Sequence, residues 1–388
     1  MNYMEVPASL QGIINAITSL ACSVQLIAVF GVKRTYPCKR WVSILNLVNQ
    51  LLFVLLYCIP SIDVSRGVKI AAFVAMLCAA YFCQYYLTPS RVNWQMNLVE
   101  DNRRGVYTAK KEIVSLIGGM LFSQATGILL DYFEEKGDMN TCFIIIGVAV
   151  TVLSILHLVI MLMTKEPEPE TEIPPKSFRE ILRVVFGNAD LRRVIIFDTM
   201  FGIANVSLHF SYVYLTNTMQ FTYTYITAIG IAHSLFRAVV SPFLGRLADK
   251  RSWAYMLRIC MIVLAIGYTI YTVSSAREVL FFLYPIFSLC QGFSSGGSNA
   301  GRTNLCLDYV EHENRRYVLG IKEAICGMVS FVATVVASFV VTWVENNGNQ
   351  IFGFSIYPQQ LLFAISAIML LALAFFFLPK LKKPDRLS

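Results

Sequence analysis

Long apolar segments alternate with short polar ones along almost the whole chain. Eleven apolar runs, each about 20 residues long, are bounded by charged residues, Gly or Pro: 8–31, 41–60, 68–90, 113–131, 141–163, 194–216, 223–245, 254–274, 278–299, 324–344 and 358–379. A helix needs about 20 mostly apolar residues to cross a bilayer. The pattern therefore predicts eleven transmembrane helices.

One polar interval is long, from residue 164 to residue 193. It contains KEPEPETEIPPK, whose alternating Glu and Pro cannot build a packed core. The stretch SFREILRVVF that follows is amphipathic. We expect a linker here, followed by a short helix near the membrane surface.

The composition agrees with a membrane protein. Of the 388 residues, 56% are apolar and 14% are charged, whereas soluble domains have about 45–50% and about 25%. The mean hydropathy is +0.60. These values exclude an ordinary water-soluble enzyme and a disordered chain, and they imply that the lipid bilayer is the main partner.

Lysine and arginine fall mostly on one side of such a membrane protein. If the polar segments alternate between two sides, one side holds 27 of the 32 Lys and Arg residues and the other holds four, with Arg237 inside a run. Positively charged loops stay in the cytoplasm. The sequence thus predicts a cell-membrane protein with its N-terminus outside and its C-terminus in the cytoplasm. Because the net charge of +8 is spread over many loops, we expect no nucleic-acid partner.

A charged segment of the first half recurs in the second half. Seven residues of segment 91–104 reappear in segment 302–316, 211 or 212 positions later. Segment 31–41 matches segment 245–253 at nearly the same offset. Both pairs fall on the predicted cytoplasmic side, so the halves have the same orientation and form a parallel repeat.

The repeat divides the chain into two helical bundles. Residues 1–163 contain five runs and residues 194–388 contain six, with 164–193 as a cytoplasmic linker. The partner of run 194–216 would precede residue 1, so the first half lacks the helix that symmetry requires. We expect an all-α polytopic membrane protein with five plus six spans in two parallel-repeat bundles.

The loop from Gly245 to Arg251, GRLADKR, resembles the signature loop of the major facilitator superfamily, in which basic residues follow Leu-Ala-Asp. The Asn-Arg-Arg segments that begin at Asn102 and Asn314 resemble the loops after the fourth and tenth helices of that superfamily. The resemblance covers the chain except for the first family helix. It implies two bundles that rock around a central site. The first-half loop departs from the pattern, with Thr35 in place of the family's Asp.

The resemblance also implies a cytoplasmic gate, in which Asp249 docks on the start of the helix near Lys110. Glu112 and Glu323 are expected to open the helices that follow each Asn-Arg-Arg loop, where a carboxylate stabilises the helix dipole. A capping role is therefore the alternative to a gating role for these two residues. The gating candidates are Gly245, Asp249, Arg251, Lys110, Glu112 and Glu323.

No pattern of a catalytic or cofactor site is present in the sequence. The four His and ten Cys show no metal-ligand spacing, and no phosphate-binding Gly-x₄-Gly-Lys loop occurs. We expect neither an enzyme nor a bound cofactor or metal. The run from Gly292 to Gly297 lies inside an apolar segment, where small residues four apart favour close helix packing.

Ionisable residues inside spans are costly and point to function. Asp198 and Arg237 lie at about equal depth, 10–12 Å from the cytoplasmic boundary at 1.5 Å per residue, on consecutive antiparallel helices. This suggests a buried ion pair, tuned by His233 one turn from Arg237. One hypothesis is a proton-linked switch in which Asp198 carries the proton. The alternative is a permanent pair that fixes helix packing.

Neutral polar residues inside spans are the candidates for a solute cavity. By the resemblance, three of the helices line the family's central path, and their polar residues are Gln84, Tyr85, Asn205, His209, Gln291 and Ser295. Asn46, Asn49 and Gln50 form another polar stripe, for which hydrogen bonding between helices is favoured. Arg91 and Arg302 are expected to extend to the membrane interface.

These observations predict a secondary active transporter that moves a small neutral solute by alternating access, coupled to protons through Asp198. We expect it to act as a monomer. The rival hypothesis is a membrane receptor or scaffold that retains the transporter fold without transport, which the missing first helix and Thr35 would favour.

Overall fold

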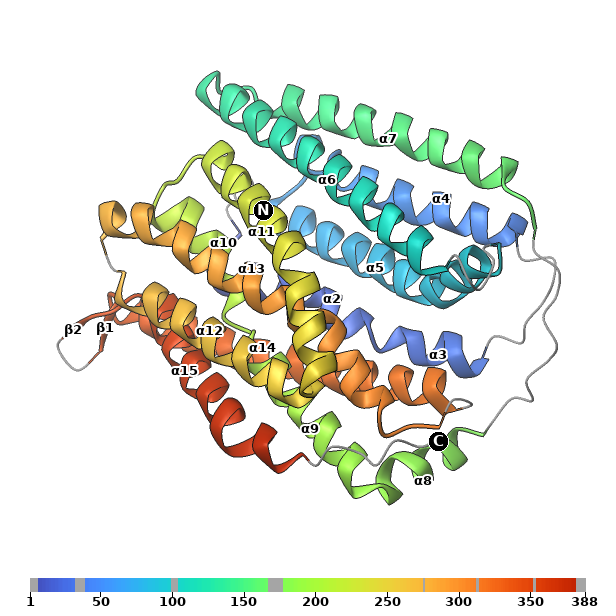
Figure 1. Ribbon diagram of the computed structural model, residues 1–388. Coiled ribbons are helices and arrows are strands. Elements are labelled where there is room, and N and C mark those ends of the chain that lie inside the picture. The colour runs from blue at the N-terminus through green and yellow to red at the C-terminus, as the bar shows by residue number, and fades with distance from the viewer. Residues whose placement is uncertain are drawn as a thin grey trace. The chain divides into compact units, whose positions relative to one another are not determined.

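The computed structural model describes residues 6–31, 39–98, 104–166, 177–274, 276–311, 314–351 and 354–381 (Figure 1). The chain forms two compact units. Unit 1 comprises Met1–Val6, Leu20–Ser177 and Thr222–Thr224, and unit 2 comprises Pro7–Ser19, Phe178–Phe221 and Tyr225–Ser388.

The helices before the linker occupy most of the first 163 residues. They are α1 (Ala8–Asn15), α2 (Ile17–Ala21), α3 (Val24–Gly31), α4 (Lys39–Leu55), α5 (Arg66–Asn97), α6 (Arg104–Glu135) and α7 (Met139–Met163), with a 3₁₀ turn at Ile59–Ser61.

The helices after the linker begin with a short one. They are α8 (Phe178–Gly187), α9 (Ala189–Ala204), α10 (Leu208–Val213), α11 (Tyr223–Lys250), α12 (Trp253–Val273), α13 (Arg277–Leu307), α14 (Arg315–Asn346) and α15 (Pro358–Ala372). Single π-helical turns follow α10 and α15 at Tyr214–Thr218 and Leu373–Phe377, and a 3₁₀ turn at Leu378–Lys380 comes last. Two short strands, β1 (Gln350–Ile351) and β2 (Phe354–Ser355), pair antiparallel between α14 and α15, with Gln350 opposite Ser355.

Ten helical segments in the described part of the chain are long and apolar enough to cross a membrane. They match ten of the eleven predicted runs. The eleventh run, 41–60, corresponds to α4, which has only 17 helical residues. The polytopic helical architecture is therefore confirmed, with one span shorter than the sequence predicts.

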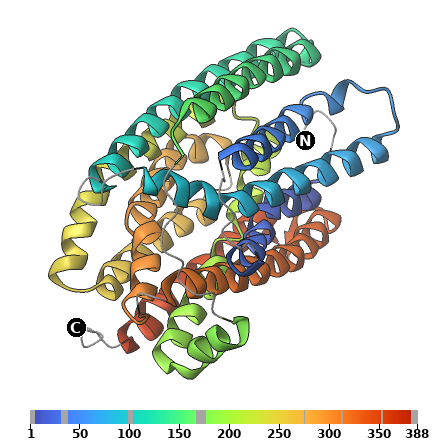
Figure 2. The same ribbon diagram turned by 90° about the vertical axis from the view of Figure 1, so that its right-hand side faces the viewer.

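The two units repeat one arrangement of neighbours. In unit 1, α4 packs against α5 and α7. In unit 2, α12 packs against α13 and α15 (Figure 1). Figure 2 shows α6 and α7 of unit 1, in teal and green, side by side. α12 begins at residue 253 and α4 at residue 39, an offset of 214 that matches the sequence repeat. The parallel repeat predicted from the loops is thus present in the packing of the helices.

Side-chain caps fix where several helices begin. The Asn188 Oδ1 atom accepts hydrogen bonds from the backbone N–H groups of Asp190 (3.0 Å) and Leu191 (3.1 Å) at the start of α9. Ser252 caps α12 and Asp138 caps α7 in the same way. The hydrogen bonds from Thr141 also hold the pKa of the exposed Asp138 carboxyl below its usual range. Each cap satisfies backbone donors that have no partner within the helix.

A break divides the span Ala189–Thr218 between α9 and α10. The Tyr268 hydroxyl, on α12, donates to Asn205 Oδ1 at 2.7 Å, and Asn205 Nδ2 donates to the Phe201 carbonyl at 2.7 Å. Ser366, on α15, donates to the Ser207 hydroxyl at 3.1 Å. Polar side chains of neighbouring helices thus stabilise an irregular segment within a membrane span.

The helix α13 carries glycines on two faces. A Cβ atom added at Gly292 would lie 2.9 Å from the His233 carbonyl oxygen of α11, and one at Gly297 would lie 2.6 Å from Cys260 Sγ of α12. Where α12 and α13 cross, a Cβ added at Gly267 would lie 2.7 Å from Cys290 Cβ. The prediction that the glycine run serves close helix packing is therefore confirmed.

We expect Gly267→Ala to destabilise unit 2 by about 1–3 kcal/mol, because the new methyl group overlaps Cys290 and the helices have to separate. The measurement is thermal unfolding of the purified protein in detergent. Gly230→Ala is the matched control, since a Cβ there meets no atom within 4 Å. Equal melting temperatures for the two variants would contradict the close approach of α12 and α13.

Candidate functional site

The most deeply buried carboxylate among the described residues of unit 2 is Asp198 on α9, whose side chain is 1% exposed. Its Oδ1 atom accepts a hydrogen bond from Arg302 Nε of α13. Its Oδ2 atom accepts one from Lys322 Nζ of α14 at 2.8 Å and a weaker one from Cys326 Sγ at 3.4 Å. One carboxylate thus joins three transmembrane helices. We call Asp198, Arg302, Lys322 and Glu323 the charge cluster.

The cluster balances its own charge. Lys322 Nζ also contacts Glu323 Oε1 at 2.9 Å, so two cations face two carboxylates. The Lys322 side chain is 1% exposed, whereas Arg302 is 22% and Glu323 37% exposed. The Arg302 guanidinium also lies 4.6 Å from the centre of the Phe201 ring, a cation–π contact. The side chains of Asp198 and Lys322 are therefore buried, whereas those of Arg302 and Glu323 are partly exposed.

The predicted pairing of Asp198 with Arg237 is wrong about the cation. Equal depth on two helices sets the height of two side chains, but the rotation of each helix about its axis decides which neighbours they meet. Both Arg237 and His233 face α13: a Cβ at Gly296 would lie 3.6 Å from Arg237 Cγ, and His233 Nδ1 lies 3.0 Å from the Ser288 carbonyl oxygen.

The true partners of Asp198 carried a signal in the sequence. Arg302 belongs to the repeated segment, and Lys322 follows it at the start of the next apolar run. The sequence predicts that Arg302 lies at the membrane interface, because the apolar run 278–299 ends before it. Instead, α13 continues to Leu307, past the end of run 278–299. The next helix, α14, begins at Arg315, before the start of run 324–344. The two cations therefore lie on regular helices that turn them toward α9.

The helix boundaries also correct the expectation for Glu323 and Glu112. Glu323 lies eight residues after the first residue of α14, and Glu112 lies eight residues after the first residue of α6. Neither residue is in the first turn, so neither caps its helix. Glu323 contacts Lys322 instead. The side chains of Glu112 and Lys110 lie outside the described residues.

The signature loop is largely helical. Gly245 and Asp249 lie in the last two turns of α11, and Asp249 is exposed. Arg251 follows directly, and its guanidinium lies 5.4 Å from the centre of the Tyr255 ring. Thr35 lies outside the described residues. Docking of Asp249 near Lys110 stays a prediction.

The predicted cavity residues fall into two groups. Asn205 bonds to Tyr268 of α12 and to its own helix, which favours a structural role. The remaining five are half-buried, and a cavity that they share stays a prediction: Gln84, Tyr85, His209, Gln291 and Ser295.

The polar stripe of α4 holds unit 1 together, as the sequence predicts. Asn46 Oδ1 accepts a hydrogen bond from Arg91 of α5 (3.3 Å). Gln50 Nε2 lies 2.7 Å from His157 Nδ1 of α7. Asn49 Nδ2 donates to the Ala80 carbonyl at 2.6 Å. Arg91 thus takes a neutral amide partner, whereas its repeat counterpart Arg302 takes a carboxylate.

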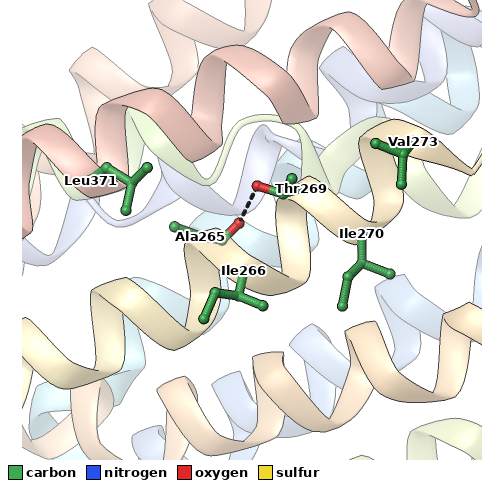
Figure 3. Close-up of a pocket in the computed structure, with 6 residues that line it drawn as sticks. All are labelled: Ala265, Ile266, Thr269, Ile270, Val273 and Leu371. Atoms are coloured by element: carbon green, nitrogen blue, oxygen red, sulfur yellow. Dashed lines mark hydrogen bonds between the residues drawn. The ribbon is translucent and has the colours of Figure 1, made fainter.

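A pocket on unit 2 is formed by α12 and Leu371 of α15 (Figure 3). It is lined by Ala265, Ile266, Thr269, Ile270, Val273 and Leu371, and it has a volume of about 240 Å³. Its one polar side chain, Thr269, donates its hydroxyl hydrogen to the Ala265 carbonyl. Because the rest of the lining is apolar, the pocket suits a lipid chain better than a polar solute. Among the described residues, no group of three His, Cys, Asp or Glu could hold a metal ion.

The family of this chain follows from its sequence and its fold. The model of the Major Facilitator Superfamily matches residues 2–275 and, in a second overlapping match, residues 194–388. The chain therefore belongs to the Major Facilitator Superfamily and is a secondary transporter rather than an enzyme.

Solved structures share the fold at low sequence identity. A mutant of the nucleoside transporter NupG has 14% identity and a TM-score of 0.70, over 98% of this chain and 92% of NupG. A D-xylose–proton symporter has 12% identity and a TM-score of 0.70, over 98% and 90% of the two chains. A bacterial homologue of the human lysosomal transporter Spinster has 12% identity and a TM-score of 0.62, over 97% and 96%. No curated protein sequence matches the chain.

We expect Asp198→Ala to destabilise the protein by about 3–5 kcal/mol, because it removes the carboxylate that pairs with both Arg302 and Lys322 and leaves the cluster with an excess positive charge. The measurement is thermal unfolding in detergent. Asp190→Ala is the matched control: Asp190 pairs with Arg193 at an exposed site, where a pair contributes about 0–1 kcal/mol. The double variant Asp198→Asn/Lys322→Met should recover part of the loss. Equal effects of the two single variants would show that the cluster does not hold the helices together.

Proposed function

We propose that this transporter couples the movement of a small neutral polar solute to protons, with the charge cluster as the coupling site. The observation that carries the proposal is a carboxylate in a transmembrane helix, Asp198, bound by cations from two other helices. Ionisable residues at such positions commonly form proton pathways in transporters.

The arrangement of the cluster supports a link between proton binding and conformation. With Arg302 and Lys322 both in contact, a proton on Asp198 would leave Glu323 as the one ionised carboxylate beside two cations, so this state opposes protonation of Asp198. Asp198 can bind a proton only in a state where at least one cation has moved away. Two states that differ in proton affinity are what energetic coupling requires.

The balanced charge of the cluster also supports a neutral solute. Two cations and two carboxylates leave no net charge to attract an ionic solute. Two of the similar structures are a nucleoside transporter and a D-xylose–proton symporter. Their named cargoes are polar and small, and the second name includes a proton.

Transport in proteoliposomes tests the coupling. Uphill solute uptake driven by a proton gradient should be lost in Asp198→Asn, while exchange of labelled for unlabelled solute continues. Because the single variant is expected to be less stable, the charge-balanced Asp198→Asn/Lys322→Gln variant is measured beside it, and Asp198→Glu should retain uphill uptake. Uphill uptake by the double variant would disprove coupling through Asp198. Solute binding with no flux in the native protein would favour the receptor hypothesis.

We also propose that the C-terminus and the linker lie in the cytoplasm, with the loop between α6 and α7 outside. The uneven distribution of Lys and Arg supports this topology. Alkaline phosphatase fused after Gly137 should be active, because that enzyme works outside the cytoplasm, whereas the same fusion after Ser388 should be inactive. The reverse activities would invert the topology.

A further inference from the structure

The short helix α8 carries more apolar surface than unit 2 covers. It packs against α9 and α14 and buries Ile181 and Val185, which are 0% and 1% exposed. Phe178 and Phe186 of the same helix remain 42% and 54% exposed. Large exposed aromatic side chains beside a membrane span indicate a surface that meets another apolar phase.

The exposed apolar edge of α8 borders a basic edge. At about 100° per residue, Phe178 and Phe186 lie on one flank of the helix, and Arg179 and Arg183 follow directly beside them. Both arginines are exposed. The acidic residue of α8, Glu180, lies farther round the helix. The helix thus presents aromatic rings and guanidinium groups in adjacent rows.

The position of α8 is fixed at its C-terminal end. Arg192 Nη1 donates to the Phe186 carbonyl at 2.5 Å, and Asn188 Nδ2 donates to the Tyr309 carbonyl at 3.4 Å. The membrane span of α9 begins two residues after α8 ends. Figure 1 shows α8 bending away from the end of α9. α8 is therefore held next to the first residues of the α9 span, where the chain leaves the hydrocarbon core of the bilayer.

We propose that α8 binds an anionic phospholipid of the membrane. Phe178 and Phe186 enter the boundary between headgroups and acyl chains, and Arg179 and Arg183 bind the lipid phosphate. An amphipathic helix with aromatic residues beside arginines fits this interface. Charge complementarity selects an anionic lipid, since each basic residue near such a surface contributes about fivefold to binding, equivalent to about 1 kcal/mol.

Fluorescence quenching tests the site without relying on transport. A tryptophan is introduced as Phe186→Trp in the full chain, and the protein is placed in nanodiscs of phosphatidylcholine and phosphatidylglycerol, with one lipid brominated at a time. The signal of the native tryptophans is subtracted with the unsubstituted protein. Brominated phosphatidylglycerol should quench the tryptophan introduced at position 186 several-fold more than its share of the lipid predicts.

Two variants locate the origin of the preference. Arg179→Gln/Arg183→Gln in the Phe186→Trp protein should reduce quenching to the share of each lipid. Lys136→Gln/Arg277→Gln removes the same charge from the predicted outer loops and should leave the preference intact. Quenching in proportion to lipid share in the parent protein would overturn the proposal. So would emission that neither lipid quenches, which would mean that water, the linker or a second copy covers α8.

Discussion

One buried carboxylate, Asp198, organises the second unit. It joins α9 to α13 and α14 through two cations at a depth where unpaired charges are very unfavourable. Its contacts define which faces of the three helices meet, because Asp198 is the one carboxylate that both buried cations share. In the proposed coupling, Asp198 binds a proton only where one of these cations has moved away. Stability and the proposed coupling therefore depend on the same contacts.

Close packing of glycines complements this electrostatic junction. Gly292 and Gly297 let α13 approach α11 and α12 on two faces, while Arg302 lies just over one turn farther along the same helix. α13 thus carries both close helix contacts and one member of the charge cluster. A rearrangement of the cluster has to move a helix that is closely packed along its length. This favours a small number of distinct states over continuous adjustment.

The sequence was sufficient to predict the helical class, the approximate number of spans and the parallel repeat, because these depend on hydropathy and loop charge alone. It also identified Asp198 as a buried functional candidate. The choice of Arg237 as its partner failed because a linear sequence gives depth but not rotation about the helix axis. Lys322 lies before the apolar run 324–344, in a segment with the composition of a polar loop, so hydropathy does not reveal that α14 begins seven residues before it. The role of Asn205 also depended on a tertiary contact, the hydroxyl of Tyr268, which no local pattern reveals.

The shortness of α4 has a consequence for the lipid around unit 1. Its 17 residues span about 25 Å, less than the hydrocarbon thickness of about 30 Å. The adjacent helices α5 and α7 are long enough to cross fully. A bilayer of full thickness therefore matches α5 and α7 better than the described length of α4. Bilayer thickness is thus a physical variable to which unit 1 is expected to respond.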